Sequence, residues 1–193
     1  MLEDLVKKSR SYRRFLENER ISIDFLTYLI SLTRFCPSAA NLQPLKYILS
    51  TNREKNKLIF NTLSWAAYLK DWKGPKEGER PSAYIVMLGD KNIAKDFRYD
   101  AGICAQTIML GATEKGFGGC ILASINRDKL REGLDIPEDF EILLVLALGK
   151  PNETVVIEDM KDAKDIKYWR DEKGIHHVPK RLLNDLILKR FSD

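Results

Sequence analysis

The stretch Ala83-Tyr84-Ile85-Val86-Met87-Leu88 is a continuous apolar run near the middle of the chain. A strand with one face in water alternates polar and apolar residues, whereas a strand covered on both faces is apolar at nearly every position. The run therefore predicts a central β-strand that is buried on both faces.

Helical and extended patterns alternate on both sides of this run. Asn52 is placed to cap a polar helix that runs to about Ser64. The helix expected over 96–115 has small and apolar residues at most positions and little polar face, so we expect it to be buried. The other expected helices cover residues 23–35 and 128–133, and the other expected strands cover residues 45–50, 117–123 and 142–148.

The length and composition are those of an ordinary globular protein. The 193 residues fit a single domain over residues 1–193, with 44% hydrophobic and 31% charged residues. No apolar run approaches the ~20 residues needed to cross a bilayer. The start, Met1-Leu2-Glu3-Asp4-Leu5, has an acidic pair where a secretory signal has basic residues, so we expect a cytoplasmic protein.

The formal net charge of +4 does not by itself indicate a nucleic-acid partner. The 28 acidic residues are interleaved with 32 basic ones, as on a solvated surface. Cys36, Cys104 and Cys120 form no CxxC pair, and the two histidines, His176 and His177, lack the further ligands of a metal site. We expect reduced thiols and no metal, nucleic-acid or membrane partner.

The segment Pro37-Ser38-Ala39-Ala40-Asn41-Leu42-Gln43-Pro44 is a candidate ligand cradle. Its prolines fix the backbone at both ends, while the side chains of Ser38, Asn41 and Gln43 can donate and accept hydrogen bonds to a flat heterocycle. The other interpretation is a turn whose Ser and Asn cap the neighbouring elements.

Two basic segments are candidate anion sites. Ser9-Arg10-Ser11-Tyr12-Arg13-Arg14-Phe15 offers guanidinium and hydroxyl donors that can hold a phosphate. His177-Val178-Pro179-Lys180-Arg181 precedes a helical pattern over 182–187, where a proline at the helix start and nearby cations can complete an anion site. Either segment can instead be ordinary solvated surface.

Taken in order, these segments resemble the FMN-dependent nitroreductase family. The start of the chain is similar to the family's basic-basic-Ser-x-Arg-x-Phe pattern, and 37–44 to its Pro-Ser-x-x-Asn-x-Gln-Pro pattern. Gly116-Phe117-Gly118-Gly119 and Leu146-Ala147-Leu148-Gly149-Lys150-Pro151 match its later glycine turn and leucine-rich strand. The resemblance implies an α+β fold with a central mixed, mainly antiparallel sheet flanked by helices, in an obligate homodimer whose centre holds the 96–115 helix.

The resemblance also implies which residues bind FMN. Arg10, Ser11 and Arg13, with Lys180 and Arg181, would hold the phosphate and ribityl chain. The partner subunit would contribute Pro37, Ser38, Ala39, Asn41 and Gln43. The backbone at Ile121, Leu122, Ala123 and Ser124 would lie beside the rings. Because Ser9 stands where the family has a second basic residue, one phosphate cation is missing or replaced, with Lys8 the nearest candidate.

The implied activity is an FMN-dependent NAD(P)H oxidoreductase. NAD(P)H would reduce the flavin and leave, and a small electrophile such as a nitroaromatic or quinone would follow with ping-pong kinetics. No catalytic side chain is required. The glycine turn precedes a strand, the reverse of the dinucleotide-binding order. The physiological acceptor and the choice of NADH or NADPH stay open.

Two other interpretations remain at this stage. The chain could bind flavin as a redox sensor or ligand-binding protein without efficient turnover, or it could have lost flavin and act as an interaction module. The segment 152–174, which has few apolar residues, is either a lid or subunit-clasping arm or a charge-rich linker.

Overall fold

The computed structural model describes residues 1–193. The chain divides into two compact units, here called the main unit (residues 1–65 and 73–152) and the C-terminal unit (residues 66–72 and 153–193). A single domain over the whole chain stays a prediction.

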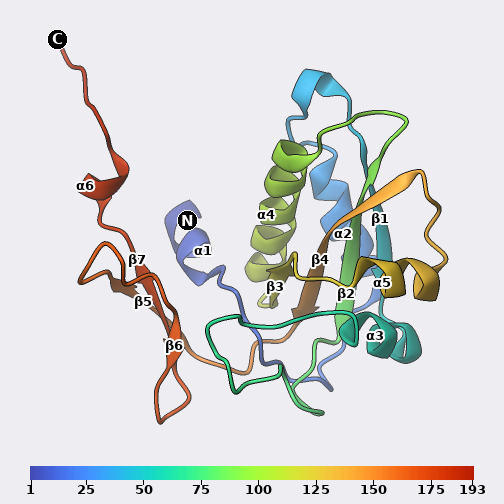
Figure 1. The fold of residues 1–193 in the computed structure, drawn as a ribbon, viewed down its shortest axis with the longest axis horizontal. Coiled ribbons are helices and arrows are strands. Elements are labelled where there is room, and N and C mark those ends of the chain that lie inside the picture. Colours follow the sequence, from blue (N-terminus) through green and yellow to red (C-terminus); the bar gives the residue numbers. More distant parts are fainter. The chain divides into compact units, whose positions relative to one another are not determined.

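A four-stranded sheet forms the centre of the main unit (Figure 1). Its order is β1 (Leu45–Ser50), β2 (Ala83–Asp90), β4 (Phe140–Gly149) and β3 (Gly118–Leu122). The predicted central strand is confirmed, because β2 lies between β1 and β4 and is buried from Ala83 to Gly89. Every strand pair in this sheet is antiparallel. An isolated parallel β-bridge joins Ser11, which lies outside the four strands, to Gly119 of β3.

Helices cover both faces of this sheet. The helices α2 (Ile23–Thr33) and α4 (Arg98–Glu114) pack with Ile85 and Met87 in the main hydrophobic core. On the other side lie α3 (Arg53–Phe60) and α5 (Arg127–Leu134), each with one fully buried aliphatic side chain, Ile59 and Leu130. A short N-terminal helix, α1 (Leu2–Lys8), has no buried residue.

Local sequence signals explain where these elements begin. Side chains of Ser22, Asn52 and Asn126 each accept a hydrogen bond from a backbone N–H in the first turn of the following helix. The cap predicted at Asn52 is therefore confirmed, although α3 ends at Phe60 rather than near Ser64. No helix has the length and apolar character that crossing a bilayer requires.

The helix α4 is buried on one face only. Asp100, Ala101, Cys104, Ala105 and Ile108 are among its buried residues. The opposite face is open, with Tyr99 73% and Ile103 39% exposed. In a single copy of the chain, the expected burial of this helix is therefore found on one face only. Small and apolar residues occur on both faces, so the sequence pattern does not show which face is exposed.

The C-terminal unit contains a small three-stranded sheet of order β5 (Val155–Asp159), β7 (His176–Lys180) and β6 (Trp169–Arg170). The pair β5 and β7 is parallel, and β6 and β7 are antiparallel. The segment 152–174 thus carries two strands. A four-residue helix, α6 (Leu183–Leu186), follows.

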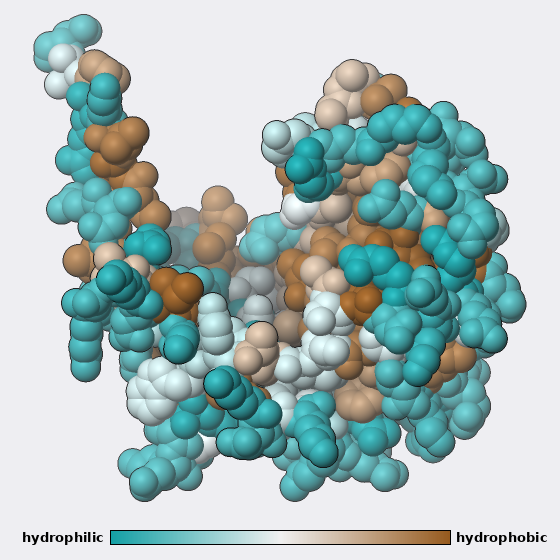
Figure 2. Space-filling model, viewed as in Figure 1, coloured by the Kyte–Doolittle hydropathy of each residue, from teal (hydrophilic) through white to brown (hydrophobic).

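The predicted proline at a helix start is wrong. Pro179 lies inside β7, opposite Glu158, and the helix begins only at Leu183. A proline pushes the residue before it into extended conformations, which suits Val178 as a strand residue. The helix and the tail after it are exposed, with Leu183 67%, Leu188 93% and Phe191 91% exposed. Figure 2 shows hydrophobic and hydrophilic side chains mixed along this part of the chain.

Candidate functional site

The N-terminal basic run lies against strand β3. Ser11 bridges Gly119 in parallel, and the Tyr12 N–H donates to the Gly119 carbonyl oxygen at 2.9 Å. A Cβ on Gly118 would lie 2.6 Å from the Tyr12 ring, and one on Gly119 would lie 2.4 Å from the Ala147 carbonyl oxygen. The glycine pair predicted as a turn therefore provides the close approach that brings the basic run onto the sheet.

The basic side chains of this run are partly or fully buried. Arg13 is 9% exposed, and its Nη1 donates to the Ser11 carbonyl oxygen at 3.1 Å. The Arg10 guanidinium donates through Nη2 to the Val6 carbonyl oxygen, while its Nε is buried and has no hydrogen-bond partner. A buried donor without a partner is unfavourable, and an anion at this place would satisfy it.

Phe15 anchors the end of the run. Its ring is fully buried and packs on Gly149, where a Cβ would lie 2.8 Å from the ring. Arg14, next to it, has its Nε 3.7 Å from a Glu79 carboxylate oxygen. Arg13 and Arg14 therefore differ: Arg13 turns back toward Ser11, and Arg14 is held by Glu79.

The predicted ring-side residues continue β3 beyond the glycine pair. Ile121 is 38% exposed, Leu122 is 6% exposed and points into the core, and Ala123 and Ser124 are exposed. The Ser124 carbonyl oxygen accepts from the Ser64 N–H at 3.0 Å. Arg10, Ser11, Arg13 and this segment therefore lie along one strand of the main unit.

The segment 37–43 forms an exposed turn before β1. The Ser38 hydroxyl accepts from the Gln43 N–H at 2.9 Å, and the Gln43 amide donates to the Asn41 carbonyl and side-chain oxygens at 3.1 Å. Ala40, Asn41 and Gln43 have φ of 48°, 55° and 53°, the left-handed region that non-glycine residues rarely adopt. The Ser38 hydrogen bond is one that a capping turn would make, whereas such backbone strain is frequent at ligand sites, so both interpretations stay open.

These two parts of the predicted site lie at opposite ends of the sheet. Gly119 of β3 pairs with Leu148 of β4, which in turn pairs with Ala83 at the start of β2. Leu45, just after the turn, pairs with Gly89 near the end of β2. Ala83 and Gly89 are six residues apart along β2, which corresponds to about 20 Å at ~3.3 Å per residue. Within one copy, the structure does not bring 37–43 together with the basic run.

Lys180 and Arg181 belong to the C-terminal unit. Lys180 ends β7 and is exposed, and its carbonyl oxygen accepts from the Met160 N–H at 2.8 Å. The Arg181 guanidinium donates to the Ala163 carbonyl oxygen at 3.3 Å. Both side chains are accessible to an anion.

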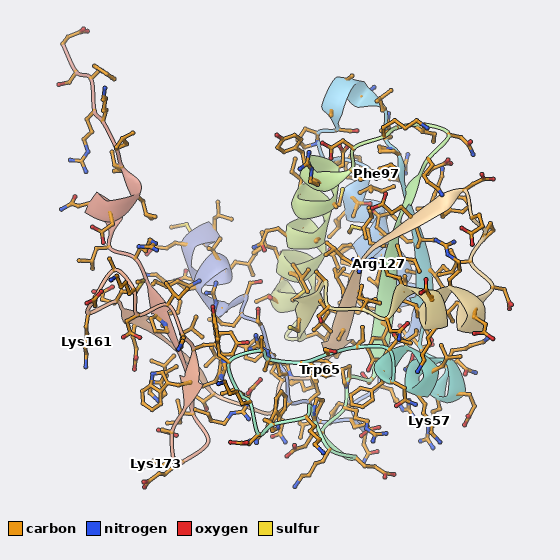
Figure 3. All side chains as sticks on the ribbon, in the orientation of Figure 1. Lys57, Trp65, Phe97, Arg127, Lys161 and Lys173 are labelled. Carbon is orange, nitrogen blue, oxygen red and sulfur yellow. The ribbon has the colours of Figure 1, made fainter.

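Two supporting residues escaped the sequence analysis. Asp100, 4% exposed in the first turn of α4, lies with one carboxylate oxygen 3.5 Å from the Ala39 N–H and so tethers the turn. Arg127, labelled in Figure 3, donates from Nε to the Ile142 carbonyl oxygen at 2.9 Å and from Nη2 to the Ala123 carbonyl oxygen at 3.4 Å. Both side chains bond to backbone groups of distant residues, and because any residue type carries those groups, no sequence motif records the contact.

The three cysteines are free thiols. Burial raises the pKa of the Cys104 thiol to about 11, so this thiol stays protonated and unreactive at neutral pH.

The profile of the Nitroreductase family matches residues 6–150. The chain belongs to this family. The matched range holds every predicted flavin residue except Lys180 and Arg181. The chain is therefore a nitroreductase-family oxidoreductase by distant homology.

Relatives of this nitroreductase-family chain are distant. It is 26% identical over 177 residues to the protein named "Putative NAD(P)H nitroreductase YodC" of Bacillus subtilis, covering 76% of this chain and 88% of the relative. It is 21% identical over 212 residues to chloronitrobenzene nitroreductase of Comamonas testosteroni, covering 82% and 90%. The nitroreductase-like fold is shared with a nitroreductase family protein of Clostridium novyi NT, at a TM-score of 0.66, 24% identity and coverage of 79% and 86%.

Proposed function

We propose that this nitroreductase-family chain is an FMN-dependent NAD(P)H oxidoreductase that passes electrons to a small electrophile such as a nitroaromatic or a quinone. One observation carries the proposal: a buried arginine donor without a partner, the Arg10 Nε, sits in a basic run that two glycines hold against β3. A second support is the solved FMN-dependent nitroreductase of Clostridium difficile, whose fold is similar at a TM-score of 0.60 and 20% identity.

The residues present fit a phosphorylated flavin. The Arg10 and Arg13 guanidinium groups and the Ser11 hydroxyl would hold the phosphate, and a guanidinium beside a phosphate makes strong charge-assisted hydrogen bonds. The backbone from Ile121 to Ser124 would border the rings, and Lys180 and Arg181 would add positive charge. When bound, FMN supplies the hydride and electron transfer, so the protein needs no acid or base of its own.

We propose that two copies of the chain form each site. The turn at 37–43 carries the polar groups suited to the ring edge, yet it lies about 20 Å along the sheet from the basic run of its own copy. A second copy would bring the partner's turn to that run. The exposed Tyr99 and Ile103 on α4 provide an apolar face for such a contact.

The open site would serve the two substrates in turn. NAD(P)H would enter, donate its hydride and leave, and the acceptor would then occupy the same space. This order predicts parallel lines when the reciprocal of the rate is plotted against the reciprocal of the NAD(P)H concentration at several fixed acceptor concentrations.

The first test is the visible spectrum of the purified protein. We expect flavin absorbance, or its appearance after FMN is added and excess removed, followed by bleaching when NADH or NADPH is mixed anaerobically in a stopped-flow instrument. A colourless protein that takes up no FMN overturns the proposal.

The replacement of a family cation by Ser9 favours a second candidate, a flavin-binding redox sensor without efficient turnover. Ser9 directly follows α1, and Lys8, the last residue of that helix, is exposed and could supply the missing charge. Rapid bleaching by a pyridine nucleotide and rapid reoxidation by a quinone would reject the sensor. Tight FMN binding with slow reduction by both nucleotides would favour it.

A further inference from the structure

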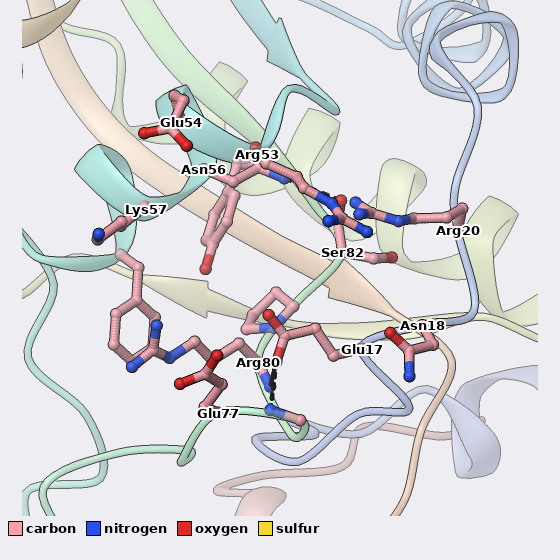
Figure 4. Close-up of a pocket in the computed structure, with 14 residues that line it drawn as sticks. Glu17, Asn18, Arg20, Arg53, Glu54, Asn56, Lys57, Glu77, Arg80 and Ser82 are labelled. Atoms are coloured by element: carbon pink, nitrogen blue, oxygen red, sulfur yellow. Dashed lines mark hydrogen bonds between the residues drawn. The ribbon is translucent and has the colours of Figure 1, made fainter.

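A cavity lies in the main unit, and none of the residues proposed to hold flavin lines it. Its volume is about 420 Å³, within the ~300–1,000 Å³ typical of small-molecule sites. Residues 17–20, the helix α3, the turn 77–82 and Tyr84 at the start of β2 form it. Figure 4 shows the side chains that line it.

The rim of this cavity carries four cations without carboxylate partners. Arg20, Arg53, Lys57 and Arg80 all line it, and none of them forms an ion pair with a carboxylate. In Figure 4 the guanidinium groups of Arg20 and Arg53 point toward one another beside Ser82. Two like charges that converge repel each other, and an anion between them turns this repulsion into attraction.

The nearby carboxylates do not neutralise this pair. The Glu17 carboxylate accepts from the backbone N–H groups of Gly78, at 2.5 Å, and Arg80, at 3.3 Å, so it holds the turn. Glu54 and Glu77 are exposed, and the Glu54 carboxylate points away from the two guanidinium groups in Figure 4. The lining carries one more cation than carboxylates.

The floor offers neutral donors. Ser82 is 1% exposed, and its hydroxyl is buried without a hydrogen-bond partner. Its backbone is fixed because the Asn56 amide donates to the Ser82 carbonyl oxygen at 2.9 Å, while the Ser50 hydroxyl donates to Asn56 at 2.7 Å. Tyr84, also 1% exposed, lines the same floor. A buried hydroxyl without a partner points to a missing ligand or water.

One wall is flat and held in place. The Arg80 guanidinium lies over the Phe60 ring, 4.6 Å from its centroid. Cation–π contact fixes the arginine and leaves a planar surface beside the cavity. The space is larger than one phosphate needs, so an organic part can extend toward this wall.

We propose that this cavity binds a small phosphate-bearing organic molecule, with the phosphate between Arg20 and Arg53 and one of its oxygens accepting from the Ser82 hydroxyl. Two guanidinium groups and a hydroxyl approach from different elements, which suits the several acceptor oxygens of a phosphate better than the two of a carboxylate. The proposal goes beyond the flavin chemistry and does not depend on it.

The test is calorimetric titration of the purified protein, with FMN added in excess in one series and omitted in a second, at constant ionic strength. The probes are inorganic phosphate, glycerol phosphate and adenosine monophosphate. We expect all three to bind, and at least one of the two organic phosphates to bind more tightly than inorganic phosphate. No binding at millimolar concentrations, or inorganic phosphate binding as tightly as both esters, overturns the proposal.

Matched variants locate the binding. We expect Arg53→Gln to weaken binding about tenfold or more and Ser82→Ala to weaken it several-fold. The control Lys55→Gln removes the same charge from the same helix, but Lys55 donates to the Gly133 carbonyl oxygen and does not line the cavity, so we expect less than a twofold change.

Two further measurements separate this site from the flavin site and from misfolding. Circular dichroism of each variant shows whether it folds, and Arg20→Gln, on a different element, must reproduce the loss. An Arg10→Gln variant must retain phosphate binding whether or not it retains FMN. Loss of phosphate binding in folded Arg10→Gln, with Arg53→Gln unaffected, would place the anion at the flavin residues and reject the proposal.

Discussion

The Ser38 hydroxyl accepts a hydrogen bond from the Gln43 N–H at 2.9 Å and closes the turn that precedes β1. Within this turn, Ala40, Asn41 and Gln43 all have left-handed φ angles. Each such angle costs a non-glycine residue about 1–2 kcal/mol, so the turn needs fixed contacts to persist.

Ser38→Ala should loosen this turn. Removing the acceptor leaves the strained turn without its closing bond and should lower the free energy of unfolding by about 1 kcal/mol, measured by urea denaturation. FMN should also dissociate faster, because the turn would no longer hold its shape. Ser31→Ala is the control, since Ser31 donates only within α2 to the Tyr28 carbonyl oxygen. Equal stability of the two variants would contradict the role given to Ser38.

Arg13→Ala should weaken FMN retention far more than Arg14→Ala. Arg13 is 9% exposed and turns toward Ser11, whereas Arg14 is engaged with Glu79. Losing a charge-assisted contact to phosphate should raise the dissociation constant of FMN at least tenfold. Titration of the protein into FMN, followed by the quenching of flavin fluorescence, measures this dissociation constant. Circular dichroism checks that Arg13→Ala still folds, and equal FMN affinity of the two folded variants would reject the assignment.

Ile103→Glu should disrupt the proposed homodimer. Ile103 lies on the open face of α4 and is 39% exposed, so a glutamate there leaves the single copy folded but places a charge in the interface. Light scattering should show monomers, and FMN should be lost with them. Ile93→Glu, at a similarly exposed residue in the turn after β2, is the control. A wild-type protein that is monomeric with FMN bound would refute the shared site.

The elements of the main unit could be predicted because their signals are local. The apolar run at 83–88 predicts β2, and the cap at Asn52 is formed as expected. The place of Pro179 could not be predicted, because β7 is set by pairing with β5, some twenty residues earlier. No local pattern records that pairing.

The predicted flavin residues were found through sequence motifs, but the residues that line the cavity with Arg20, Arg53 and Ser82 form no motif. Arg20, Arg53 and Ser82 come from three separate segments, and each charge by itself reads as solvated surface. Only the folded chain places these three residues around one cavity. The same is true of Asp100, whose contact with the Ala39 backbone joins residues 61 positions apart.

The stability of the small C-terminal sheet should fall as the pH rises above neutral. His177 is hydrogen-bonded to Glu158, and this bond raises the pKa of the imidazole above its ordinary value of 6.5, with Asp171 adding to the effect and partial burial opposing it. A group whose pKa is raised by folding stabilises the folded state fully below its unfolded pKa. That contribution is lost as the pH rises from about 6.5 through the raised pKa.

The His177 ring stacks on Trp169 at 4.1 Å and 8° between planes, so tryptophan fluorescence and the imidazole proton resonances should both follow the titration. Hydrogen exchange of the β5 and β7 amides should quicken over the same pH range. Glu158→Gln removes the main cause, so the pKa of His177 should fall and the pH dependence of exchange should flatten. The same titration midpoint in the wild type and in Glu158→Gln would show that Glu158 does not set this pKa.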